Sequence, residues 1–173
     1  MGVFAMEQII ITNVKDAKCD LDYNQNEQFD PGGEHKYAYE FQRSDISKPF
    51  AQGWGKLEVF FYTLQPGKAA CPYHYHTANE EFFYIISGRG TLKTPEGSKA
   101  VSEGDAIVMP AHENGAHTLI NTSEAPLVYI DLQTVISPEV VIHPESQKAV
   151  LFAPNVFMKA FKIDSAVNYL TGE

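Results

Sequence analysis

The sequence predicts an all-β domain, a barrel or a sandwich of short strands. From Leu57 onward, short apolar runs rich in β-branched and aromatic residues alternate with turns that contain Gly or Pro. Such turns occur at residues 65–67, 88–90, 95–97 and 103–105. No segment with a convincing helical period interrupts this series. Regularly spaced short strands of this kind are typical of all-β barrels and sandwiches.

The N-terminal part of the chain is less regular. Residues 7–14 and 36–43 alternate enough to predict two strands, whereas the polar residues 20–33 end in Pro31-Gly32-Gly33 and predict a mobile loop. At 173 residues the chain fits one domain of ordinary size. We therefore expect a single domain over residues 1–173. It would have a barrel core of about residues 50–136, an N-terminal extension (1–49) and a C-terminal tail (137–173).

The central strands follow in order. Residues 74–76 are predicted to be extended, residues 77–79 form a short connection, and the apolar residues 81–86 form the next strand. Residues 106–109 form a further strand that ends at Pro110, and residues 117–121 form another. By strand parity from Glu81, Phe83 and Ile85 should face the interior.

Three histidines and one glutamate in these strands form a candidate metal site. Side chains alternate along a strand, so His74 and His76 project to the same side, about 7 Å apart. The short connection brings Glu81 back toward them, and His117 supplies a fourth ligand. Three imidazoles and one carboxylate suit a divalent transition metal and leave it open to water or substrate. Zinc favours four ligands, while manganese, iron, cobalt or nickel keep further positions free, so zinc, iron, manganese and nickel all remain candidates.

The spacing of these residues resembles the two motifs of the cupins, a superfamily of small β-barrel proteins. The first motif matches at Gly67, His74, His76, Glu81 and Gly88, and the second at Gly104, Pro110, His117 and Asn121. The resemblance implies a double-stranded β-helix (jelly-roll) barrel preceded by an N-terminal extension. It also implies that His74, His76, Glu81 and His117 are the metal ligands.

More narrowly, the chain resembles a group of small single-domain bacterial cupins with a His-Tyr-His first motif. The segment from His143 to Lys148 and the ending from Asn168 to Glu173 are similar to that group. The likeness covers about residues 50–173.

Several residues near the motifs depart from the pattern or compete for a role. Glu81 fits the motif better than Glu80 because six residues separate it from Gly88, the usual cupin interval, and Glu80 is expected to be a solvated charge. The second motif is two residues longer than usual between Pro110 and His117, and His112 stands where a glycine is usual. We interpret His112 as a loop histidine near the barrel mouth. His35 and His143 lie outside both motifs, and we assign neither to the site.

Composition limits the partners of the chain. The net charge is −9, and no basic stripe is present to displace counterions from phosphate, which argues against nucleic acid and anionic membranes as partners. No apolar run reaches the ~20 residues needed to span a bilayer, and the start lacks a secretory signal, so we expect a cytoplasmic protein. Met6 is an alternative translation start.

Cysteines and aromatic residues complete the expectations. Cys19 and Cys71 are too few for a disulfide framework. Strand alternation from His74 would turn Cys71 to the opposite face and exclude it as a ligand, unless a local bulge intervenes. Tyr73 and Tyr75 should face outward, where exposed aromatics suggest a homodimer interface.

Two functions are compatible with this pattern. The first is a metal-dependent enzyme for a small organic molecule, in which the ion polarises a carbonyl or enolate oxygen, or activates oxygen if it is iron. Dioxygenase, isomerase and decarboxylase chemistries all occur in cupins, and no residue beyond the four ligands identifies a general base. The alternative is a non-catalytic module that binds or senses a small molecule or sugar.

Overall fold

The computed structural model describes residues 13, 16, 19, 21–23, 41–47, 55–153 and 156–172. In this part of the chain the structure is almost entirely β, with two short 3-10 helices, η2 (Glu113–Gly115) and η3 (Ile163–Ser165). The predicted all-β class is confirmed. The predicted segment 7–14 lies, except for Asn13, outside the described residues, as does His35.

The largest sheet has six strands in the order β1-β2-β3-β10-β5-β8, and all its pairings are antiparallel. Its members are β1 (Leu21–Tyr23), β2 (Phe41–Asp45), β3 (Leu57–Leu64), β10 (Leu127–Thr134), β5 (Glu81–Ser87) and β8 (Ala106–Met109). Strand β1 corrects the predicted loop at residues 21–23, and the rest of the predicted loop, residues 20 and 24–33, lies outside the described residues. Three residues are too short a segment to show alternation, and they form a strand by pairing with β2.

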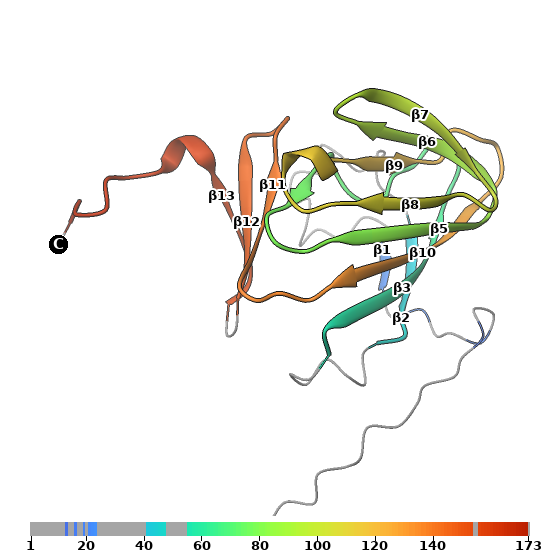
Figure 1. Ribbon diagram of the computed structural model, residues 1–173, viewed down its shortest axis with the longest axis horizontal. Coiled ribbons are helices and arrows are strands. Elements are labelled where there is room, and N and C mark those ends of the chain that lie inside the picture. Colours follow the sequence, from blue (N-terminus) through green and yellow to red (C-terminus); the bar gives the residue numbers. More distant parts are fainter. Residues whose placement is uncertain are drawn as a thin grey trace, which may run out of the picture.

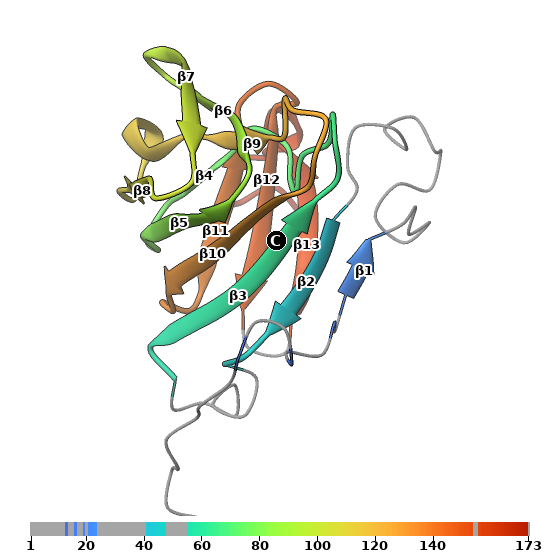
Figure 2. The same ribbon diagram turned by 90° about the vertical axis from the view of Figure 1, so that its right-hand side faces the viewer.

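Two smaller sheets complete the fold. One has the order β13-β12-β11-β4 and the other the order β7-β6-β9. Their strands are β4 (Tyr75–His76), β6 (Arg89–Thr94), β7 (Gly97–Ser102), β9 (Thr118–Ile120), β11 (Glu139–His143), β12 (Lys148–Ala153) and β13 (Val156–Lys162). Figures 1 and 2 show β6, β7 and β9 above β5 and β8, while β11, β12 and β13 stand beside the ends of these strands. Bridges from Ala69 to Ile120 and from His74 to His117 join the chain before β4 to β9.

The interior lies between the sheets and is formed by alternate residues of the central strands. Along β5, Glu81, Phe83 and Ile85 are buried while Tyr84 is 41% exposed, so the predicted inward face of this strand is confirmed. Tyr129 of β10 packs between the rings of Phe83 and Tyr62, with centroid distances of 4.9 and 5.1 Å. The inward face of β5 therefore carries the apolar core and, at its first residue, a buried carboxylate.

Asn121 holds together the end of the barrel opposite Glu81. It is fully buried, and its amide nitrogen donates to the carbonyls of Leu64 and Ala125 at 3.0 and 2.8 Å. Its amide oxygen accepts from the backbone N–H of Ser123 at 3.0 Å. This network satisfies backbone groups where β3 and β9 end and shortly before β10 begins, which gives the asparagine of the second motif a structural role.

Candidate metal centre

Short antiparallel contacts place the candidate ligands. His76 ends β4 opposite Val141 of β11, and Glu81 begins β5 between Met109 of β8 and Gln133 of β10. His74 and His117 form an isolated bridge and exchange two backbone hydrogen bonds of 3.0 and 2.8 Å. The backbone thus brings three histidines from distant positions to one side of Glu81.

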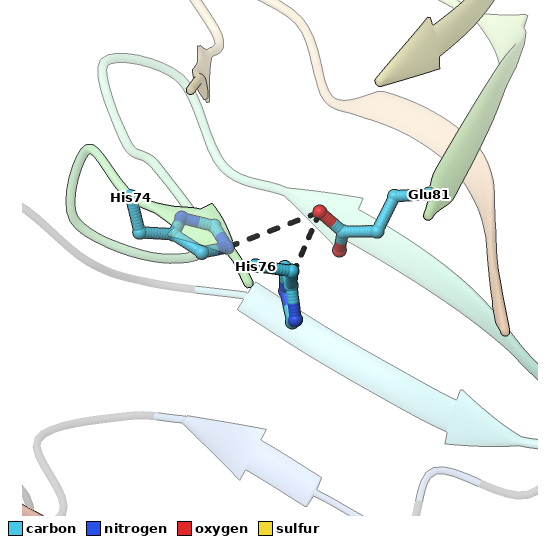
Figure 3. A group of neighbouring side chains, drawn as sticks. All are labelled: His74, His76 and Glu81. Atoms are coloured by element: carbon cyan, nitrogen blue, oxygen red, sulfur yellow. Dashed lines mark ion pairs between the residues drawn. The ribbon is translucent and has the colours of Figure 1, made fainter. Parts of the chain in front are cut away.

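The three imidazoles converge on one oxygen atom. Their Nε2 atoms lie 4.0 Å (His74), 3.5 Å (His76) and 3.3 Å (His117) from Oε2 of Glu81. Figure 3 shows the three side chains side by side, with dashed lines from one carboxylate oxygen of Glu81 to the imidazoles of His74 and His76. The ligand atoms of His74, His76 and Glu81 all lie within 4.8 Å of one another, so these three residues could hold a metal ion.

Two of the imidazoles have fixed tautomers. Nδ1 of His74 lies 2.9 Å from the carbonyl oxygen of Pro72, and Nδ1 of His117 lies 2.9 Å from that of Gly115. Because a carbonyl oxygen only accepts, each Nδ1 must carry the proton, and each Nε2 keeps its lone pair toward Glu81. Nε2 of His117 is buried and has no hydrogen-bond partner among the described residues. A buried nitrogen with a free lone pair is what a metal ligand requires, so the donor set fits a divalent ion.

Burial sets the protonation of the site. It lowers the pKa of His76 to about 4, with a further contribution from His143, and it lowers that of His117 to about 4. The pKa of His74 is also lowered well below its usual range by burial and by the neighbouring His117 and His76. All three are therefore neutral at pH 7, the form that binds metals.

Burial acts on Glu81 in the opposite sense. It raises the pKa of this carboxyl well above its usual range, and the carboxylates of Asp131 and Glu139 add to the effect. A buried negative charge beside neutral imidazoles and further carboxyl groups is costly, and a bound cation would offset that cost.

The other residues considered from sequence take different places. Glu80 is exposed, as predicted, and His112 is an exposed loop residue whose backbone N–H donates to the carbonyl of His76 at 2.7 Å. His112 has a φ of 72°, in the left-handed region that glycine adopts most easily, which accounts for the glycine usual at this position. Tyr73 is half-buried, with the Lys93 amine 4.9 Å from the centre of its ring.

Contrary to the prediction from strand alternation, Cys71 does not turn to the face opposite His74. Its Sγ atom lies 3.6 Å from Nδ1 of His74, and burial raises the pKa of the thiol, with Glu81 and Asp131 adding to the effect. Strand alternation does not extend to this position because β4 contains only Tyr75 and His76. The thiol approaches the Nδ1 side of His74 and not the Nε2 side that faces Glu81.

Sequence reasoning missed two neighbours of the centre, both from β11. The ring of His143 stacks on that of His74, with centroids 5.7 Å apart and an interplanar angle of 29°. Glu139 is 4% exposed, and its Oε1 lies 3.8 Å from Nδ1 of His76. The available signal in the sequence was the position of Glu139, directly before the apolar residues 140–142. A charged residue in a strand that is predicted to be buried needs a partner.

Comparison with known proteins identifies the fold. Residues 60–133 match the family model described as a cupin domain. No curated protein matches the chain by sequence. No helix in the described part of the chain is long and apolar enough to cross a membrane.

Solved structures with the same fold include two proteins named for sugar phosphates. One, from Silicibacter pomeroyi, is described as a sugar phosphate isomerase from a cupin superfamily. It has a TM-score of 0.66 and 20% identity, over 75% of this chain and 81% of that one. The other, from Acidithiobacillus ferrooxidans, is provisionally named a sugar phosphate isomerase. It has a TM-score of 0.63 and 24% identity, over 73% of this chain and 80% of that one.

A third similar structure is the polyketide cyclase RemF from Streptomyces resistomycificus. Its TM-score is 0.55 at 16% identity, over 76% of this chain and 84% of that one. At these identities the three structures establish a shared fold, and the similar proteins carry different activities on it.

Proposed function

The chain belongs to the cupin superfamily, and on that premise we propose that it is a metal-dependent enzyme acting on a small organic molecule. The proposed ligands are His74, His76, Glu81 and His117. The observation that carries the proposal is the convergence of three neutral imidazole Nε2 atoms on one buried carboxylate oxygen. The single-domain organisation over residues 1–173, the cytoplasmic location and the homodimer stay predictions.

The number of proposed ligands favours a metal ion that stays open to substrate. Four protein ligands leave a manganese, iron or nickel ion with further positions for a substrate, whereas zinc would be satisfied by four. A divalent ion bound here would polarise a carbonyl or enolate oxygen of the substrate. Phe83 and Tyr129 provide an apolar wall behind His117, because the Phe83 ring lies edge-on to the imidazole at 5.3 Å and packs on Tyr129. Such a wall keeps water from one side of the ligands.

The reaction class is proposed to be isomerase, decarboxylase or dioxygenase chemistry on an oxygen-bearing substrate. The names of two similar folds make sugar phosphates the first substrates to assay. Sugar acids, 1,3-dicarbonyl compounds and catechols follow, because each presents adjacent oxygens that can chelate a cation.

The test is turnover by metal-loaded protein. Purified protein is stripped of metal, reloaded separately with Mn(II), Fe(II), Ni(II) or Zn(II), and assayed with these substrates by product chromatography and oxygen uptake. The proposal predicts turnover with at least one ion, which is lost in Glu81→Gln and retained in Glu80→Gln, a matched change at the neighbouring exposed carboxylate. Stoichiometric metal and tight ligand binding without turnover in any combination would instead establish a binding module.

A further inference from the structure

Glu139 lies outside the segment that matches the cupin family model, yet it contacts the loop between two of the proposed ligands. It begins β11, and its carboxylate accepts the backbone N–H groups of Thr77 at 2.8 Å, Ala78 at 3.3 Å and Asn79 at 3.0 Å. The Thr77 hydroxyl adds a fourth donor at 3.3 Å. This loop connects His76 to Glu81, so a buried charge on β11 fixes the path between them.

The same carboxylate faces the ring of His76. Strand β4 pairs with β11 through His76 and Val141, and the N–H of Thr77 also donates to the carbonyl of Val140 at 3.0 Å. These bonds hold the imidazole between two carboxylates. Glu81 lies on the Nε2 side at 3.5 Å, and Glu139 lies on the Nδ1 side at 3.8 Å.

His76 differs from the other two histidines in one respect. Nδ1 of His74 and Nδ1 of His117 each have a backbone carbonyl at 2.9 Å, whereas Nδ1 of His76 is buried without a hydrogen-bond partner among the described residues. Oε1 of Glu139 is an acceptor within 3.8 Å of that nitrogen, beyond hydrogen-bond range by less than about 1 Å. A rotation of the ring that shortened this distance to about 3 Å would complete a hydrogen bond to Oε1, which already accepts from Thr77 and Ala78.

We propose that Glu139 is a positioning residue for the metal centre, which accepts the Nδ1 proton of His76 and so keeps the Nε2 lone pair directed at Glu81. The inference rests on the proposed metal site. It extends the site beyond residues 60–133, because the acceptor and the loop contacts both come from β11. A carboxylate on the far nitrogen of a ligating histidine fixes its tautomer and raises its basicity, and the loss of such a partner typically weakens metal affinity about 10- to 100-fold.

The first measurement uses metal-free wild-type protein. Long-range ¹H–¹⁵N spectra of the histidine rings report which nitrogen of each ring carries the proton. The expected result is the Nδ1–H form at His76, as at His74 and His117. The Nε2–H form at His76 would overturn the proposal, and this result does not depend on whether any variant folds.

The second measurement is Co(II) affinity, determined from the visible absorption of the bound ion in competition with a chelator. Glu139→Gln is expected to weaken Co(II) binding about 10- to 100-fold and to introduce the Nε2–H form at His76, while the tautomers of His74 and His117 stay unchanged. The control is Glu145→Gln, which removes an exposed charge paired with Lys93 near the end of the same strand and should change neither quantity.

The outcomes separate this proposal from the proposed function. If Glu139→Gln melts at a lower temperature but keeps wild-type Co(II) affinity and the Nδ1–H form of His76, Glu139 only ties down the loop, and the proposal is wrong. If wild-type protein binds no Co(II), the metal site of the proposed function fails, while the tautomer of wild-type His76 still decides the role of Glu139.

Discussion

Nε2 of His117 lies 3.3 Å from Oε2 of Glu81, and no hydrogen bond satisfies this buried nitrogen within the described part of the chain. Glu81 begins β5 of the six-stranded sheet, whereas His117 immediately precedes β9 of the three-stranded sheet. The contact exists because His117 bridges His74 through backbone hydrogen bonds. Its free lone pair is the observation on which we base the proposal of His117 as a fourth ligand, beside the group of His74, His76 and Glu81.

We predict that His117→Ala weakens Co(II) affinity by more than the roughly 10- to 100-fold expected from losing a supporting partner. The fold should persist, because the backbone bridge to His74 does not need the imidazole. The affinity is measured by chelator competition, and far-ultraviolet circular dichroism checks the fold. His112→Ala, at an exposed histidine of the preceding loop, should retain wild-type affinity. Equal affinities for the two variants would remove His117 from the ligand set.

Gly115 should tolerate no side chain. A Cβ atom at this position would lie 1.8 Å from the carbonyl oxygen of Pro110. Gly115→Ala must therefore displace backbone, and we expect it to lower the free energy of unfolding by about 1–3 kcal/mol. Because the Gly115 carbonyl accepts the Nδ1 proton of His117, Co(II) affinity should fall as well. Urea unfolding measures the first effect, and the control is Glu113→Ala, at an exposed position of the same 3-10 turn. A Gly115→Ala variant as stable as this control would contradict the packing described.

Asp131 should make stability depend on pH. Burial raises the pKa of this carboxyl to about 7, the Glu58 carboxylate adds to the shift, and the Arg43 guanidinium opposes it. The unfolded chain loses this proton near pH 4 and the folded chain only near pH 7, so the contribution of Asp131 to stability falls as pH rises between these values and then levels off.

Asp131→Asn removes that dependence. The difference in unfolding free energy, variant minus wild type, should therefore increase by on the order of a few kcal/mol when the pH is raised from 5 to 8. Urea unfolding at several pH values measures the difference, with Glu124→Gln as an exposed control. A difference between Asp131→Asn and wild type that does not change with pH would show that the carboxyl ionises normally.

The two cysteines should differ in reactivity. Cys19 is exposed, whereas the thiol of Cys71 faces the interior and burial raises its pKa. Because the thiolate is the reactive form, iodoacetamide at pH 8 should modify Cys19 quickly in the native protein and Cys71 only after unfolding. Peptide mass spectrometry follows both sites, and Cys19→Ser should leave almost no native labelling. Comparable rates at both cysteines would contradict the orientation of Cys71.

Local pattern was sufficient to predict the strands that carry the centre. Strand β5 was predicted over 81–86 and spans Glu81–Ser87, and β8 spans the predicted residues 106–109. Both strands are apolar segments bounded by turn residues, and these two features are visible in the sequence. The side-by-side placement of His74 and His76 follows from the same alternation.

Long-range contacts could not be predicted in this way. The hydrogen bond from Thr77 to Glu139 joins residues 62 positions apart, and no local period encodes it. Cys71 was misplaced because alternation was extended from a two-residue strand into a bend. Strand β1 was missed because its pairing with β2, and not its own composition, makes it a strand.

The most direct test of the account is the number of metal ions per chain. Protein purified without a histidine tag or chelator is analysed for all transition metals, as isolated and after reloading and desalting, together with the variants His76→Ala and Glu81→Gln. The account predicts about one divalent ion per wild-type chain and loss of most of it in both variants with the β fold intact. Stoichiometric metal in either variant, or a wild-type chain that takes up none, would contradict it.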